Sequence, residues 1–142
     1  NGGLVPDFDL LPHPPGSIWH TPLPEARRRG TRVENIIHAI GPKNDSEFTA
    51  DSSKTEARER ASAIVCRMTA RILRLAQDEL GAKTVVLSGI STGIFSSGDT
   101  LWAAEMYAAM RSAISAHVLS PSGNGGQRDL KVVLLGSWQD NG

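Results

Sequence analysis

The stretch Thr84-Val-Val-Leu-Ser-Gly-Ile90 and the segment that follows it, Ser91-Thr-Gly-Ile-Phe-Ser-Ser-Gly98, decide the fold that we expect. The first has the length of a strand and is apolar at nearly every residue, which is typical of a strand buried on both faces of a parallel sheet. The second is rich in glycine and hydroxyl residues and precedes a helical pattern. We therefore predict a buried strand that runs into a loop, with Leu87–Phe95 as the working end of the protein.

Helical patterns flank this strand on both sides. Ser53 and Glu56 have the spacing of a capping box, and Gly81 is placed to end the first helix in the left-handed conformation. Asp99 is placed to cap the second helix. The apolar face predicted for the first helix comprises Ala57, Ala61, Ile64, Val65, Met68, Ile72, Leu75, Ala76 and Leu80. The face predicted for the second comprises Leu101, Trp102, Met106, Ala109, Met110, Ile114 and Val118.

Two further strands complete the pattern. Residues 33–40 are rich in β-branched residues and end at Gly41-Pro42, and residues 130–135 form a third apolar run. The order strand, helix, strand, helix, strand predicts an α/β fold whose parallel sheet carries helices on its faces. Residues 43–52 are expected to be a polar linker. Six of the eight prolines lie within residues 6–24, so residues 1–32 are expected to be irregular.

Length and charge limit the function classes. A chain of 142 residues suits one domain, here 1–142 with a core over 33–136. Lys plus Arg and Asp plus Glu both number 15, so no global field attracts a membrane, and charge gives no support to nucleic-acid binding. The run Arg27-Arg28-Arg29, beside Glu25 and Glu34, is expected to be solvated surface.

The lone cysteine, Cys66, excludes an internal disulfide and favours a reducing compartment, so we expect an intracellular protein, cytoplasmic or nuclear. Its helical position predicts a buried and inert thiol. No apolar run approaches the roughly 20 residues that a membrane-spanning helix needs. The N-terminus lacks the layout of a signal peptide, and its start without Met suggests a trimmed piece of something longer.

The loop 91–98 has the composition of an anion site. Gly93 and Gly98 allow close backbone approach, and successive N–H groups can form a concave nest for phosphate. Four hydroxyl residues offer further donors, whereas no Lys or Arg lies within the loop, so binding would depend on backbone donors and the helix dipole. A plain Gly/Ser turn is the alternative. The loop is not a Walker loop, because Gly-Lys-Ser/Thr is absent, and it is not a dinucleotide fingerprint, because the spacing from Gly89 to Gly93 is wrong. The four hydroxyl residues are Ser91, Thr92, Ser96 and Ser97.

The ordered pair Ile36-Ile-His-Ala-Ile-Gly-Pro42 and Val85-Val-Leu-Ser-Gly-Ile-Ser-Thr-Gly-Ile-Phe95 resembles the macro domain family, whose members bind ADP-ribose. The family shows a strand ending in I-H-x-V-G-P and, about 45 residues later, a P-x-[IL]-S-T-G-[IVF]-[YF] loop. The resemblance covers roughly residues 31–136. It implies a three-layer α/β/α macro-like fold with a mostly parallel central sheet. It also implies ADP-ribose or mono-ADP-ribosylated protein as ligand, with no cofactor and no metal.

The resemblance also implies roles for single residues. The backbone of Ser91, Thr92, Gly93 and Ile94 would hold the diphosphate, with Phe95 against the distal ribose or, alternatively, in the core. Gly89 belongs to the same predicted site. His38 matches the family's strand, and we expect it to be structural. Weaker ligand-binding candidates lie at the two ends of the chain: Gly3, Val5, Trp138 and Asp140.

Other family motifs are missing. The Gly-Asp-Ile strand, the V-N-A-A-N segment and the G-G-G-V loop are not found intact, so no catalytic residue is assigned. Three functions therefore stay open: a binder of ADP-ribose, a hydrolase of ADP-ribosyl groups or phosphatase of ADP-ribose 1″-phosphate, and a macro-like protein or nucleic-acid interaction module that has lost the ligand. An acid or histidine near the ribose would have to orient water. The candidates in the N-terminal third are Asp7, Asp9, His13, His20 and Glu25.

Overall fold

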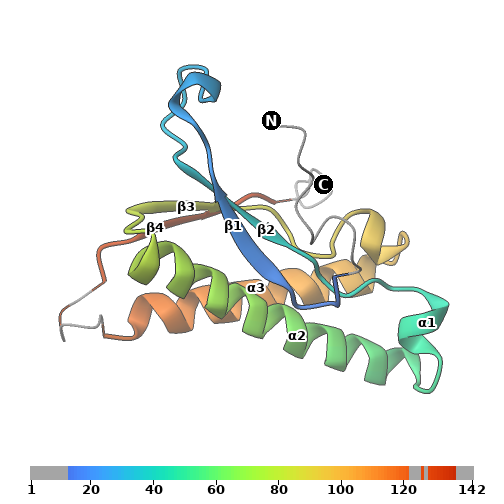
Figure 1. The fold of residues 1–142 in the computed structure, drawn as a ribbon. Coiled ribbons are helices and arrows are strands. Elements are labelled where there is room, and N and C mark those ends of the chain that lie inside the picture. The colour runs from blue at the N-terminus through green and yellow to red at the C-terminus, as the bar shows by residue number, and fades with distance from the viewer. Residues whose placement is uncertain (1–12, 122–125, 127, 137–142) are drawn as a thin grey trace.

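The computed structural model describes residues 13–121, 126 and 128–136, and shows a mixed α/β protein (Figure 1). Two long helices lie side by side beneath short strands. Strands are β1 (Ile18–Pro22), β2 (Asn35–Ala39), β3 (Thr84–Leu87) and β4 (Lys131–Leu134). Helices are η2 (Glu25–Arg27), α1 (Ser46–Thr49), α2 (Lys54–Arg74), η3 (Leu75–Glu79), η4 (Ile94–Ser96) and α3 (Thr100–Leu119).

The described strands form two separate pairs. β3 and β4 are parallel, with Thr84 opposite Lys131, as the crossover through α3 predicts. β2, expected to be a third strand of that sheet, pairs instead with β1 in an antiparallel hairpin, with Ile18 opposite Ala39. The expectation of one parallel sheet over β2, β3 and β4 was therefore wrong, and the three-layer arrangement is not shown.

The proline-rich segment contains a strand that the sequence pattern concealed. Residues 18–22 were expected to be irregular, yet they form β1. Among the described residues β1 pairs on one side only, with β2, and its proline, Pro22, stands at its last position. A proline without an N–H is tolerated at such an edge. Likewise, α1 interrupts the expected linker at 43–52, because the Asp45 carboxylate accepts the N–H of Phe48 and caps a short helix.

The helix boundaries were predicted correctly. The Ser53 hydroxyl accepts the N–H of Glu56, whose carboxylate accepts the N–H of Ser53, so the capping box is confirmed. After α2 a π-helical turn, η3, leads to Gly81, whose φ of +68° is left-handed as expected. Asp99 caps α3 by accepting the N–H groups of Leu101 and Trp102.

The core lies between α2, α3 and the β3–β4 pair. Its largest fully buried side chains include Trp102, Met68, Leu73, Met106 and Met110. Cys66, expected to be buried, is half-buried against this core. No helix among the described residues is long and apolar enough to span a bilayer.

Three predicted burial positions were wrong. Val86 is 60% exposed, because only one face of β3 packs against helices in the described part of the chain. Leu101 and Val118 are also exposed, because α3 turns a face through Tyr107, Ala113 and His117 toward the core instead.

Candidate functional site

The ends of β2 and β3 meet, and this contact joins the two motifs that the sequence separates by about fifty residues. The Ser91 hydroxyl donates to the buried carbonyl of Pro42 at 2.6 Å. Gly41 packs so closely here that a Cβ would overlap the Ser91 hydroxyl and lie 2.5 Å from Ile90 Cγ2. The indole Nε1 of Trp102 donates to the carbonyl of Ser91 at 3.0 Å. The start of the loop is therefore fixed from both sides.

The hydroxyl groups of the loop hold the loop itself. Thr92 Oγ1 donates to the carbonyl of Gly89, and Ser96 Oγ donates to that of Gly93. Ser97 Oγ donates to the carbonyl of Asn44. Together with Ser91, all four hydroxyls predicted as ligand donors thus have backbone acceptors. In the structure these hydroxyls therefore shape the loop, and their predicted role toward a ligand stays a prediction.

The main-chain N–H groups of Thr92, Gly93 and Ile94 have no hydrogen-bond acceptor within the described part of the chain. Gly93 is exposed, and a Cβ there would meet no atom within 4 Å. Ile94 is 89% exposed and begins the turn η4. Consecutive unpaired N–H groups on an open surface can bind an anion by donating hydrogen bonds to it, as a backbone nest does. The use of residues 91–94 as a ligand site stays a prediction.

The structure adds a cation that the sequence did not reveal. Lys43 follows the β2 motif and is exposed, and its Nζ lies over the ring of Phe95, 5.9 Å from the centroid. The next residue, Asn44, holds the loop: its N–H donates to the carbonyl of Phe95, and its Nδ2 donates to that of Ser96. We had expected binding without any cation. The sequence feature that could have revealed this cation is the polar pair Lys43-Asn44, directly after Gly41-Pro42.

Gly89 has a packing reason to be glycine. A Cβ at this position would lie 2.6 Å from the ring of Tyr107, whose hydroxyl donates to the carbonyl of Leu135 at 3.4 Å. The backbone of Gly89 therefore lies against α3, while its carbonyl accepts the hydroxyl of Thr92. Gly89 therefore supports the loop on the side that faces α3.

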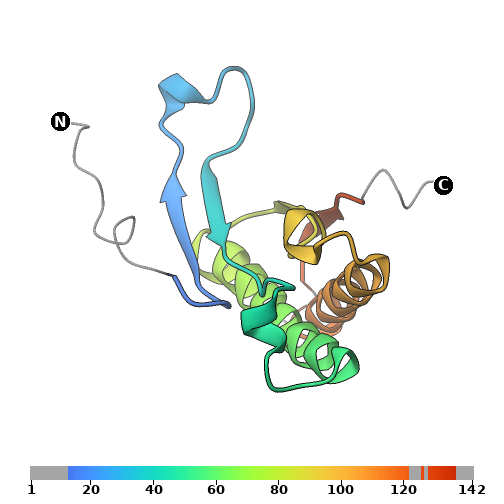
Figure 2. The same ribbon diagram turned by 90° about the vertical axis from the view of Figure 1, so that its right-hand side faces the viewer.

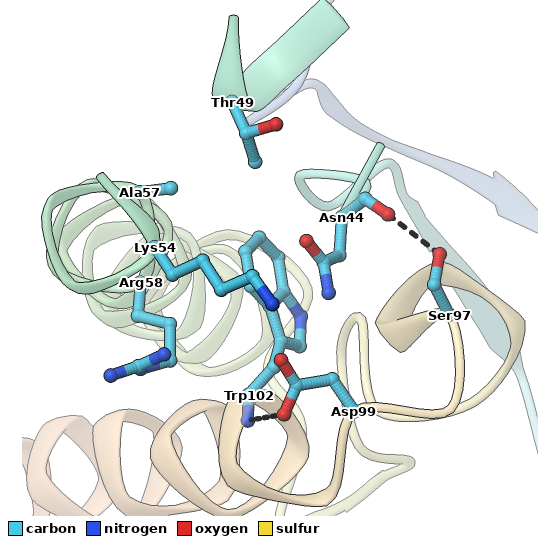
Figure 3. Close-up of a pocket in the computed structure, with 8 residues that line it drawn as sticks. All are labelled: Asn44, Thr49, Lys54, Ala57, Arg58, Ser97, Asp99 and Trp102. Atoms are coloured by element: carbon cyan, nitrogen blue, oxygen red, sulfur yellow. Dashed lines mark hydrogen bonds between the residues drawn. The ribbon is translucent and has the colours of Figure 1, made fainter. Parts of the chain in front are cut away.

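A cavity of about 250 Å³ lies on the helix side of the loop (Figure 3). Figure 3 shows the Lys54 side chain reaching across it toward Asp99 and Trp102. Arg58 is paired with Glu105 at 3.2 Å, whereas Lys54 has no ion-pair partner among the described residues. Of the predicted site residues, 91–95 do not line this cavity, which is therefore separate from the predicted diphosphate surface. Its lining consists of Asn44, Thr49, Lys54, Ala57, Arg58, Ser97, Asp99 and Trp102.

The remaining candidates do not gather at the loop. His38 stacks on Trp19, with ring centroids 5.2 Å apart, and bonds to Thr21 Oγ1, in keeping with a structural role. His13 also stacks on Trp19, and Glu25 lies at the far end of the β1–β2 hairpin. His20 is exposed on β1. Six candidates lie outside the described residues: Gly3, Val5, Asp7, Asp9, Trp138 and Asp140.

Within residues 13–121, 126 and 128–136, no group of three or more His, Cys, Asp or Glu side chains is placed to hold a metal ion. Comparison with known proteins gave no relationship: no protein-family model, no curated protein and no solved structure matches this chain.

Proposed function

We propose that this chain binds ADP-ribose, free or attached to a protein, through the loop Ser91–Phe95. The observation that carries the proposal is the row of unpaired N–H groups at Thr92, Gly93 and Ile94. They lie just beyond the carboxyl end of β3, a strand of a parallel pair, which is the edge where ligands bind in α/β proteins. A diphosphate suits such donors, because it presents several anionic oxygens to a concave backbone.

Lys43 and Phe95 extend this surface beyond the diphosphate. The Lys43 ammonium adds the charge that the loop lacks, and the Phe95 ring offers a flat apolar face for a sugar. An exposed ion pair contributes roughly 0.2–1 kcal/mol, so Lys43 should change affinity about fivefold at most. The backbone donors, not the lysine, therefore carry most of the proposed recognition.

Binding, not hydrolysis, is the activity that these residues support. Asp45, next to Asn44, and Asp99, which follows the loop in sequence, both cap helices. De-ADP-ribosylation would need a further group to orient water. Incubation with a mono-ADP-ribosylated protein separates the two activities, because a binder leaves the label in place.

Calorimetric titration of the full chain with ADP-ribose tests the proposal. Gly93→Glu and Gly93→Gln form the matched pair, since both add a side chain of one size and only the first adds a negative charge. We expect binding by the wild type and weaker binding by Gly93→Glu than by Gly93→Gln, by tenfold or more. Lys43→Ala should lose a few-fold and Lys43→Arg much less. No heat and no thermal shift at millimolar ADP-ribose would overturn the proposal in favour of an interaction module without this ligand.

A further inference from the structure

The β1–β2 hairpin ends in a cluster of arginines, which we call the arginine tip: Arg27, Arg28, Arg29 and Arg32. The sequence suggested ordinary solvated surface here. The fold places the arginines at the outer end of a two-stranded ribbon, and this end stands away from the helices (Figures 1 and 2), whereas the other end packs against the core through Ile18 and Ala39. A neutral chain thus concentrates positive charge on one projecting element.

The arginine tip is a shaped turn. The N–H of Arg28 donates to the carbonyl of Glu25, and the N–H of Thr31 donates to that of Arg28. The Arg28 Nε also donates to the carbonyl of Leu23 at 3.0 Å. Arg29 has a φ of +47°, a region that L-residues seldom adopt, although Gly30 stands next to it. A bulky cation held at such a position suggests a use for its side chain.

The charges of the arginine tip are available. Arg27, Arg29 and Arg32 are exposed. Within the described part of the chain no carboxylate lies within 4.0 Å of any of the four guanidinium groups, although Glu25 and Glu34 are near in sequence. Guanidinium groups bind phosphate oxygens in bidentate fashion, and all four cations here are arginine.

We propose that the arginine tip binds duplex DNA, with this outer end of the β1–β2 hairpin entering the major groove. A groove about 12 Å wide admits a two-stranded hairpin, and arginines at its end can reach the phosphates that line the groove. The position of the arginine tip favours this partner over an acidic peptide. A peptide needs a pocket or a free strand edge. The described cavity lies elsewhere, between α2 and the loop 91–99, and the edges of β1 and β2 end at Pro22 and Asn35, before the arginine tip begins.

The salt dependence follows from the number of arginines. Four phosphate contacts give a slope of log K against log salt of about −3.6, so affinity should fall roughly 150-fold between 50 and 200 mM salt. Binding should be of the non-specific class, with a Kd of about 10⁻⁴–10⁻⁶ M at physiological salt.

The test is fluorescence anisotropy of the full chain with a labelled 20-base-pair DNA over a salt series. The double variant Arg27→Gln/Arg29→Gln should halve the slope, to about −1.8, whereas Arg27→Lys/Arg29→Lys should keep it near the wild-type value. Arg67→Gln/Arg111→Gln changes net charge equally on α2 and α3, and should leave DNA binding unchanged. Gly93→Glu should also bind DNA as the wild type does, which separates this inference from the proposed ADP-ribose site.

Three results would overturn the inference. The first is no anisotropy change at 50 mM salt with protein at 100 µM. The second is an equal loss in both double Gln variants, which would show a response to net charge alone. The third is binding of a poly-glutamate peptide but not of DNA, which would assign the arginine tip to an acidic protein partner.

Discussion

Replacement of Ser91 tests whether the two motifs are joined as the structure shows. In Ser91→Ala the buried carbonyl of Pro42 loses the hydroxyl that donates to it at 2.6 Å. An unsatisfied buried acceptor costs about 1–3 kcal/mol of unfolding free energy. For a chain of this size, 2 kcal/mol lowers Tm by roughly 4–8 °C.

Ser91→Gly separates the hydrogen bond from the backbone conformation. Ser91 has a φ of +59°, which glycine adopts without the steric penalty of a side chain. Ser91→Gly loses the same hydrogen bond, but it should be more stable than Ser91→Ala by about 1 kcal/mol. Urea denaturation of the three proteins, followed by circular dichroism, gives the order wild type, Gly, Ala. The reasoning fails if Ser91→Ala is as stable as the wild type, or if Gly and Ala are equal.

Three further predictions concern the frame around the loop. Leu73→Ala, in the core, should destabilise by about 2–5 kcal/mol in urea denaturation, whereas Leu119→Ala, at a side chain 85% exposed, should change stability by less than about 0.5 kcal/mol; equal losses would place the core elsewhere. Asp99→Ala should lower the free energy of unfolding by about 1 kcal/mol in thermal melting, because the N–H groups of Leu101 and Trp102 lose their cap. Asp99→Asn should keep most of this stability, and an Ala variant as stable as the wild type would contradict the cap. Burial, and then the Arg128 guanidinium, lower the pKa of His117 below its ordinary 6.5 despite nearby Asp78, so the unfolded chain binds the proton more readily than the folded chain. The contribution of His117 to the free energy of unfolding should therefore be fully present above pH 6.5 and fall as the pH drops below it. His117→Gln should remove this pH dependence, and a flat wild-type profile would disprove it.

Helices were predictable because their signals are local. The capping box at Ser53, the left-handed Gly81 and the cap at Asp99 each depend on residues within one turn of the helix end. The buried face of α3 was predicted less well. Met106 and Met110 were correct, but Tyr107 and His117 escaped notice, because their polar atoms find partners only in the folded chain.

Strand pairing was not predictable in the same way. The sequence of β2 does not determine whether it pairs with β1 or with β3, since either pairing satisfies the backbone hydrogen bonds of β2. The strand β1 was hidden because Pro22 and neighbouring prolines argue against regular structure, and an edge position relaxes that rule. The exposure of Val86 has the same origin, since burial of a strand face depends on what packs over it.

The position of the strand-end loop was predictable from the sequence, and the hydrogen-bond partners of its hydroxyl groups were not. The strand-end loop was found from glycine and hydroxyl content, yet the hydroxyls bond to the loop's own frame. Lys43 was missed because it lies about fifty residues away in sequence, and only the contact between the ends of β2 and β3 brings it to Phe95.

The most direct measurement of the central claim is a titration of the ¹⁵N-labelled full chain with ADP-ribose, followed by amide chemical shifts. The account predicts that the amides of Thr92, Gly93 and Ile94 shift together and saturate, because their N–H groups would donate to the diphosphate. The amides of Thr49 and Lys54, beside the cavity on the other side of the loop, should move little. Saturable shifts confined to Thr49 and Lys54, or none at Thr92 to Ile94 at millimolar ligand, would contradict the account.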